Sequence, residues 1–250
     1  RSLAARLAGS PSPLPDAAEA VLWNIRLPRV AAAALVGAAL SAAGAAFQNM
    51  FRNPLVSPDI LCVSAGCGLG ASLAILLGLT WYAVSGFAFV GGIVAVALVM
   101  LIARRVGEHE PVLVLVLAGV AVGALLGAGI ALVKLLADPG VQLPAITFWL
   151  LGGLNAVKPD DLPYAAPALL AGAATLWLAR WRINLLGLPD DEAASLGVHV
   201  GRLRAIVVAA ATLMTAAAVA LSGIIGWVGL VVPHLARFMV GPEFSRLLPM

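Results

Sequence analysis

Long runs without a charged residue are the feature that most constrains this chain. Five of the runs that contain no Asp, Glu, Lys or Arg are candidate crossings, and they extend over 22, 44, 23, 18 and 32 residues (30–51, 60–103, 111–133, 162–179 and 205–236). A helix needs about 20 apolar residues to cross the hydrocarbon core of a bilayer. The run 60–103 is long enough for two crossings, and the run 205–236 is long for one crossing and short for two.

The composition excludes most classes of soluble protein. Only 11% of the residues are charged and 62% are hydrophobic, whereas roughly 25% are charged in a typical soluble domain. An ordinary cytosolic enzyme, a nucleic-acid-binding domain and a disordered chain are therefore excluded. The net charge of +3 reflects loop arginines that set membrane topology rather than contact with nucleic acid. We predict an all-α, polytopic transmembrane helical bundle that forms one transmembrane domain over residues 1–250.

Arginines at the ends of the runs predict which loops lie inside the cell. They form three pairs: Arg104 with Arg105, Arg180 with Arg182, and Arg202 with Arg204. All three pairs are placed in the cytoplasm, as the positive-inside rule requires. Arg237 and Arg246 then also lie inside only if the last run crosses twice, with a break at Ser222-Gly223. This gives seven predicted spans, over residues 30–51, 62–79, 83–103, 112–136, 162–179, 205–222 and 224–240.

This topology places residues 1–25 and 138–161 outside and the loop 184–201 in the cytoplasm. A chain that starts outside without a signal peptide is expected to continue an earlier span, so we expect this sequence to be an internal stretch of a longer protein. The partner of the apolar surface is the lipid membrane.

Small residues at regular spacing predict close helix packing. Gly119, Gly123 and Gly127 repeat every four residues, as do Gly66 and Gly70. Such stripes let helix backbones approach closely in lipid. Cys62 and Cys67 lie on different helical faces without a nearby histidine, so we predict small packing residues and no metal site.

The predicted outer loop 137–161 contains an apolar, aromatic half-helix that is too short to cross. It includes Phe148 and Trp149 and ends in the glycine pair Gly152-Gly153. A segment of this length is re-entrant or interfacial. The residues alone leave two interpretations open, a gate and a helix lying on the membrane surface.

The predicted cytoplasmic loop 184–201 contains a short helix of a different kind. Its start is predicted by a proline followed by acidic residues, which suit the positive end of a helix. Its stop is predicted by a glycine that accepts the left-handed conformation. The residues in order are Pro189, Asp190, Asp191, Glu192, Ala193, Ala194, Leu196 and Gly197. Two turns are not stable alone, so we predict a docking helix held by a partner protein, with a solvated loop as the alternative.

No residue pattern in the chain supplies energy for transport. The predicted spans hold no Asp or Glu, which ion-coupled carriers usually need. The only lysines, Lys134 and Lys158, lie outside any phosphate-binding loop motif. We therefore predict a transport subunit that is not itself an enzyme, has no cofactor and draws energy from a separate ATPase.

The chain resembles the FecCD-type permeases, the membrane subunits of ABC importers for iron–siderophores, haem and cobalamin. The resemblance rests on Arg26-Leu27-Pro28-Arg29, on Arg52-Asn53-Pro54-Leu55 and on Gly229-Leu230-Val231-Val232-Pro233-His234. It implies ten spans per subunit, of which this chain matches the second to the eighth, in a homodimer in the bacterial inner membrane. Residues 188–198 match the loop that couples to the cytoplasmic ABC ATPase.

The resemblance also implies the outer partner and the cargo. Arg26 and Arg29 match arginines that dock the periplasmic substrate-binding protein. An iron–siderophore is the favoured cargo, with haem or cobalamin as alternatives. Cys62 departs from the family, which more often has glycine at this position.

Three other classes of function stand against this interpretation. An ion-coupled secondary transporter is disfavoured because the predicted spans lack a carboxylate. An intramembrane enzyme needs a polar catalytic pair at one membrane depth, which the spans do not present. A purely structural subunit does not explain two faces that each resemble a docking surface.

Overall fold

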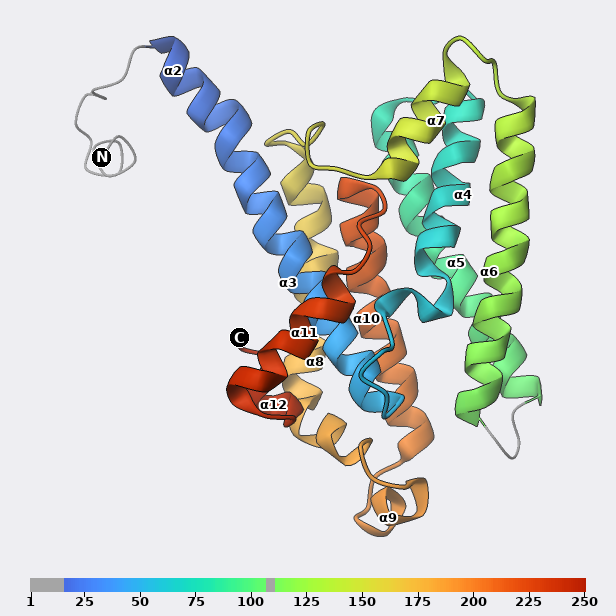
Figure 1. Cartoon of the computed structure of the whole chain (residues 1–250), viewed down its shortest axis with the longest axis vertical. Coiled ribbons are helices and arrows are strands. Elements are labelled where there is room, and N and C mark those ends of the chain that lie inside the picture. The colour runs from blue at the N-terminus through green and yellow to red at the C-terminus, as the bar shows by residue number, and fades with distance from the viewer. Residues whose placement is uncertain (1–15, 107–110) are drawn as a thin grey trace.

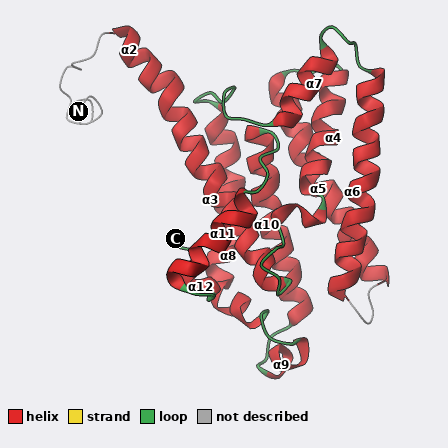
Figure 2. Cartoon of the chain, viewed as in Figure 1, coloured by secondary structure: helices red, strands yellow, loops and turns green. Residues whose placement is uncertain are grey.

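The computed structural model describes residues 16–106 and 111–250 of the chain. Within these ranges the regular structure is entirely helical, which confirms the predicted all-α fold (Figure 2). The first fifteen residues of the predicted outer segment 1–25 lie outside the described part of the chain.

The helices follow one another along the chain with short connections (Figure 1). They are α2 (Asp16–Val21), the π-helical turn η1 (Leu22–Arg26), α3 (Leu27–Met50), the 3₁₀ turn η2 (Pro58–Leu61), α4 (Val63–Leu76), α5 (Trp81–Val106), α6 (Pro111–Leu136), α7 (Gln142–Leu151), α8 (Asp161–Leu185), α9 (Asp190–Ser195), α10 (Val200–Ser222), α11 (Val228–Val240) and α12 (Phe244–Leu247). One end of the bundle carries α2 and α7 and the other carries α9, and we name them the outer and inner ends after their predicted sides (Figure 1).

Five helices of the described part are long and apolar enough to cross a membrane, which makes the chain a multi-pass membrane protein. They cover Ala18–Met50, Trp81–Val106, Val112–Leu136, Asp161–Leu185 and Val200–Ser222. The last two extend beyond the predicted spans 162–179 and 205–222 because their terminal arginines remain helical. The Arg180 guanidinium, for example, lies over the Trp177 ring at 4.3 Å. Charge-free runs therefore underestimate helices whose ends carry long basic side chains.

The predicted spans 62–79 and 224–240 contain shorter helices. The helix α4 has 14 residues and α11 has 13, or about 21 and 20 Å at 1.5 Å per residue. Each follows an irregular segment and starts at a residue in the left-handed conformation, Cys62 with φ 57° and Trp227 with φ 69°. Figure 1 shows both helices beginning partway along the bundle. Whether these two segments complete the seven predicted crossings stays a prediction.

The first long helix extends further out than the predicted span 30–51. It runs without interruption from Asp16 through η1 into α3. Pro28 explains the π-helical turn, because proline has no N–H to donate to the preceding turn. The helix widens there, and the Leu27 N–H donates to Leu22 O, five residues back.

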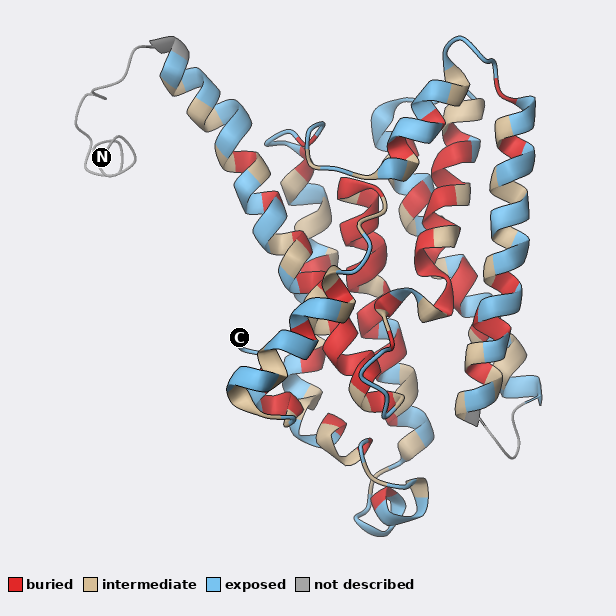
Figure 3. Ribbon diagram, in the orientation of Figure 1, coloured by how far each residue is buried: buried red, intermediate tan, exposed pale blue. Residues whose placement is uncertain are grey.

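The core of the bundle lies along α10 and the inner half of α3. Two thirds of the apolar window of α10 (67%) is buried, against 17–50% in the other four long helices. Figure 3 shows this concentration of buried residues, with α6 at an edge that is largely exposed. The helix α10 contacts α3, α5 and α8, so it connects most of the bundle and runs from the inner to the outer end.

Candidate functional site

The predicted docking helix is present at the inner end as α9. Pro189 precedes it, and Asp190, Asp191 and Glu192 form its first turn. Gly197 has φ +81°, and its N–H donates to Ala194 O while the Val198 N–H donates to Ala193 O. These two bonds form a Schellman stop, so the local geometry matches the sequence prediction. The Ala193 side chain is buried and Leu196 is 60% exposed.

Asp190 fastens α9 to two other elements. Its Oδ1 accepts from Arg52 Nη2 at 2.6 Å and from Arg204 Nη2 at 2.7 Å. Burial would raise the pKa of the Asp190 carboxyl, but the hydrogen bonds and charges of Arg204 and Arg52 outweigh it and hold the pKa below its usual value. A carboxyl whose pKa is lower in the folded protein stabilises the fold at pH values above its unfolded pKa of about 4. This stabilisation is lost as the pH falls through the folded pKa. The ion pairs are therefore complete at neutral pH.

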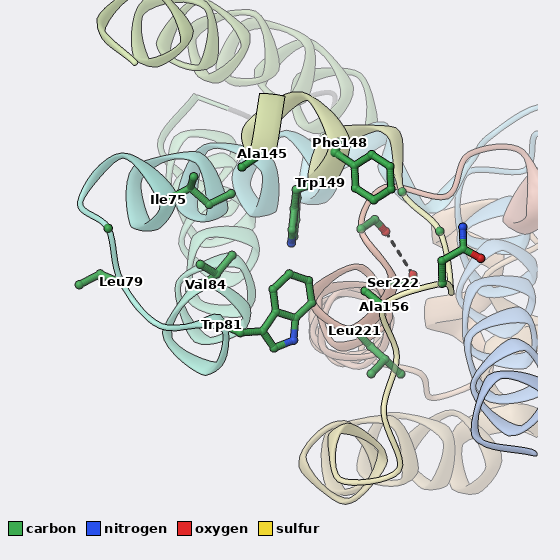
Figure 4. A pocket seen from close by; sticks show the side chains of 15 residues that line it. Ile75, Leu79, Trp81, Val84, Ala145, Phe148, Trp149, Ala156, Leu221 and Ser222 are labelled. Carbon is green, nitrogen blue, oxygen red and sulfur yellow. Dashed lines mark hydrogen bonds between the residues drawn. The ribbon is translucent and has the colours of Figure 1, made fainter. Parts of the chain in front are cut away.

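At the outer end, α7 forms one wall of an apolar pocket of about 410 Å³. Figure 4 shows the rings of Phe148, Trp149 and Trp81 around this space. Gly152 and Gly153 lie on its wall where the chain leaves α7. The structure thus brings all four residues of the predicted gate to one pocket, and their role as a gate stays a prediction.

The end of α7 is locked to the end of α10. The Gly153 N–H donates to Ser222 O at 2.7 Å. A methyl group at Gly152 would overlap Ile224 O, and one at Gly223 would approach Trp149 O. Backbone contact at this point therefore requires glycine on both sides.

The two predicted docking arginines have different surroundings. Arg26 is exposed on the outer extension of the first helix, and it forms no ion pair within the described residues. Arg29 is half-buried, and its Nη2 donates to Asn155 O at 2.6 Å. Arg29 therefore lies at the outer end and also bonds the loop that follows α7 to the first long helix.

The predicted packing glycines divide into three groups. A methyl group at Gly66 or Gly70 would overlap the backbone of α5, and one at Gly119 would overlap Ile60 O. At Gly123 the nearest atom is the Cβ of Cys62, at 3.3 Å from the position of an added Cβ. Among the described residues, nothing lies within 4 Å of an added Cβ at Gly127. Cys62 and Cys67 are free and buried. In the described ranges, no three His, Cys, Asp or Glu side chains gather as metal ligands.

The comparison with known protein families identifies this architecture. A sequence profile of the FecCD transport family matches residues 4–250. The chain belongs to the FecCD transport family.

Individual FecCD relatives carry different cargo names. The chain is 39% identical to the cobalamin import system permease protein BtuC of Halobacterium salinarum, over 94% of this chain and 63% of that protein. It is 38% identical to the molybdate import system permease protein MolB of Haemophilus influenzae, over 92% and 68%. It is 37% identical to the hemin transport system permease protein HmuU of Yersinia pestis, over 91% and 70%. The chain thus spans about two thirds of these relatives.

Solved structures share the FecCD fold. An ABC transporter of the metal-chelate type in an inward-facing conformation superposes with a TM-score of 0.89 at 36% identity, covering 95% of this chain and 76% of that one. The PsaBC structure from Streptococcus pneumoniae, at 17% identity and a TM-score of 0.63, shares the fold alone.

The structure also reveals site residues that the sequence analysis missed. Arg52 lies 138 residues from Asp190, so nothing local indicates their ion pair. A methyl group at Gly44 would overlap Gly229 O where α3 crosses α11, although Gly229 lies in a stretch that resembles the family. Asp59 is a third residue that no local pattern indicates, and its Oδ1 accepts from the Ser64 N–H at the start of α4.

Proposed function

We propose that this chain is the permease subunit of an ATP-driven ABC importer in a bacterial inner membrane. The observation that carries the proposal is α9, a short exposed helix that is fastened by Asp190 at the inner end of an apolar bundle. A separate cytoplasmic ABC ATPase docks on α9, a periplasmic binding protein docks at the outer end, and a second copy of the chain completes the path. ATP binding shifts the bundle between outward- and inward-open states through differential contacts with α9.

The cargo in this proposal is a metal chelate, with an iron–siderophore favoured. The pocket beside α7 has the size of small-molecule sites, which range over about 300–1,000 Å³. Its Trp81, Phe148 and Trp149 side chains suit a chelate with an apolar or aromatic body better than a bare oxyanion. Family members are named for cobalamin, molybdate and hemin. Membership of the family therefore does not by itself specify the cargo.

Proteoliposomes containing the chain, its ATPase and its binding protein test the function. We expect uptake of labelled chelate to require ATP and to persist when the ion gradient is collapsed. Gly197→Val should reduce this uptake about tenfold, because a β-branched residue at φ +81° costs about 1–3 kcal/mol and distorts the stop of α9. The measurement is uptake per ATP hydrolysed, together with co-purification of the ATPase.

Gly201→Val is the matched control for this experiment. Gly201 lies in the first turn of α10, and an added Cβ there meets nothing within 4 Å. The control should transport like the wild type. If Gly197→Val also kept wild-type uptake and wild-type co-purification, α9 would not be the coupling element.

Arg26 is proposed to contact carboxylates of the binding protein. Arg26→Glu should lower the association rate about tenfold at low salt and much less at high salt, because rim charges steer encounter and are screened by ions. The rate is measured by surface plasmon resonance on the chain in nanodiscs. Arg105→Glu, at the inner end of α5, is the control and should not change it. Equal rates for wild type and Arg26→Glu at low salt would exclude the docking role.

A further inference from the structure

One carboxylate oxygen at the inner end joins three elements. Asp190 Oδ1 accepts from Arg52, in the turn after α3, and from Arg204, in the second turn of α10. Arg52 also donates through Nε to Leu186 O at 3.1 Å. We name Arg52, Asp190 and Arg204 the inner clamp. It ties α9 to the inner ends of both α3 and α10.

The clamp is partly buried, unlike an ion pair on a solvated surface. The Arg204 side chain is only 12% exposed, against 43% for Asp190 and 38% for Arg52. The Arg204 Nε is buried and has no hydrogen-bond partner among the described residues. Loss of the Asp190 carboxylate would therefore leave a nearly buried guanidinium without its anion, which is costly in a site of low dielectric constant.

Arg52 shows a second sign of constraint. It is a non-glycine residue with φ +51°, in the left-handed region that few such residues occupy. Strained residues of this kind persist only where surrounding contacts hold them. The bonds to Leu186 O and Asp190 are the side-chain contacts that hold this one.

The helix α10 extends from the clamp to the outer pocket. Its 23 residues correspond to about 35 Å at 1.5 Å per residue. At its outer end, Ser222 O accepts from the Gly153 N–H, and Ser222 lines the pocket beside Trp149. A helix that is buried along most of its length and tied at both ends moves as a rod rather than by bending.

We propose that the inner clamp positions α9 on α10, so that a displacement of α9 moves α10 and changes the pocket formed by α7 at the other end. The inference rests on the proposed function, since the displacement comes from the docked ATPase. Arg52, Asp190 and Arg204 are positioning residues, and none of them contacts the cargo. Coupling of this kind needs an element with two arrangements, and each of the two sites must favour one of them. In this proposal the element is α10, and the two sites are the inner clamp and the outer pocket.

The test reports on the outer pocket while the inner clamp is changed. Phe148, which is 68% exposed beside the pocket, is replaced by a fluorophore-labelled cysteine in a background without Cys62 and Cys67. The full chain is assembled with its ATPase in nanodiscs, and the fluorescence change on adding ATP with vanadate is recorded. Asp190→Asn should reduce this change about fivefold or more, at the low end of typical coupling between sites, while the ATPase still co-purifies.

Glu243→Gln is the matched control, because it removes another ion-paired carboxylate, bonded to Arg246 at 2.8 Å, that lies outside both α9 and the clamp. It should keep the wild-type fluorescence change. Arg204→Lys should retain most of the change because the charge remains. Arg52→Gln, at the more exposed side of the clamp, should reduce the change even if Asp190→Asn fails to fold.

Two outcomes separate this inference from the proposed function. A wild-type chain that gives no fluorescence change with an active ATPase would overturn the proposed function and the inference with it. A wild-type change that survives in both Asp190→Asn and Arg52→Gln would overturn only the inference, and the clamp would then be a local stabiliser of α9.

Discussion

Gly44→Leu is expected to abolish accumulation of folded protein. At the crossing of α3 and α11 the two backbones touch, and even a methyl group at Gly44 would overlap Gly229 O. The obstacle is backbone, which cannot rotate away as a side chain can. The cost should therefore exceed the ~1–3 kcal/mol that is typical of overpacked cores. Size-exclusion chromatography and thermal unfolding of the detergent-solubilised protein measure the effect.

Separation of α11 from α3 also breaks a polar connection beside the glycines. The Arg237 Nη1 donates to Gln48 Oε1, and Gln48 Nε2 donates to Leu230 O at 3.2 Å. Gln48 is buried, and a buried amide without partners is destabilising. Gly127→Leu is the control, since nothing in this chain lies near an added Cβ there. A Gly44→Leu protein as stable as this control would show that the α3–α11 contact does not exist.

Gly152→Ala is expected to detach α7 from α10 and disorder the outer pocket. The residue has φ +67° and ψ 157°, a region that is essentially restricted to glycine, and its Cβ would overlap Ile224 O. Backbone strain and collision act together, so the chain must move. Hydrogen exchange of residues 142–153 should accelerate about tenfold or more as this segment opens locally, and ATP-driven uptake should be lost.

The control for this prediction lies in the connection between α10 and α11, which contains the Ile224 that faces Gly152. Gly226→Ala adds a methyl group where nothing stands within 4 Å, at a residue without a positive φ. It should exchange like the wild type. Wild-type protection of residues 142–153 in Gly152→Ala would mean that α7 is not locked to α10 in the way described above.

Charge-free runs predicted the regular helices well. The predicted spans 83–103 and 112–136 correspond to Trp81–Val106 and Pro111–Leu136, because each of these apolar runs is helical throughout. The segment 223–227 before α11 defeats the same criterion, because it carries no charge although the chain there is not helical. No local pattern marks Trp227 as left-handed. Cys62 is different, because the family's preference for glycine at this position agrees with its φ of 57°.

The candidate sites divide in a similar way. Pro189 and Gly197 delimit α9 because helix starts and stops depend on neighbouring residues, and the structure confirms both ends of this helix. Arg52 and Gly44 were missed because their partners lie more than a hundred residues away and only the fold brings them together. The sequence therefore predicted the helix α9 and did not predict the contacts that hold it.

The short helices α4 and α11 determine the order in which this protein can be built. At about 21 and 20 Å they fall short of the ~30 Å hydrocarbon core, so neither can leave the translocon for lipid as an independent unit. The helix α4 can insert stably only after α5 has been synthesised and packs against it. The helix α11 must pack against α3, whose Gln48 accepts a hydrogen bond from Arg237 and is synthesised 189 residues earlier. Until then the Gly44 surface of α3 stays open in the membrane. Biogenesis of this protein therefore includes a late docking step, and we expect a nascent chain truncated before α11 to be a substrate for membrane proteases.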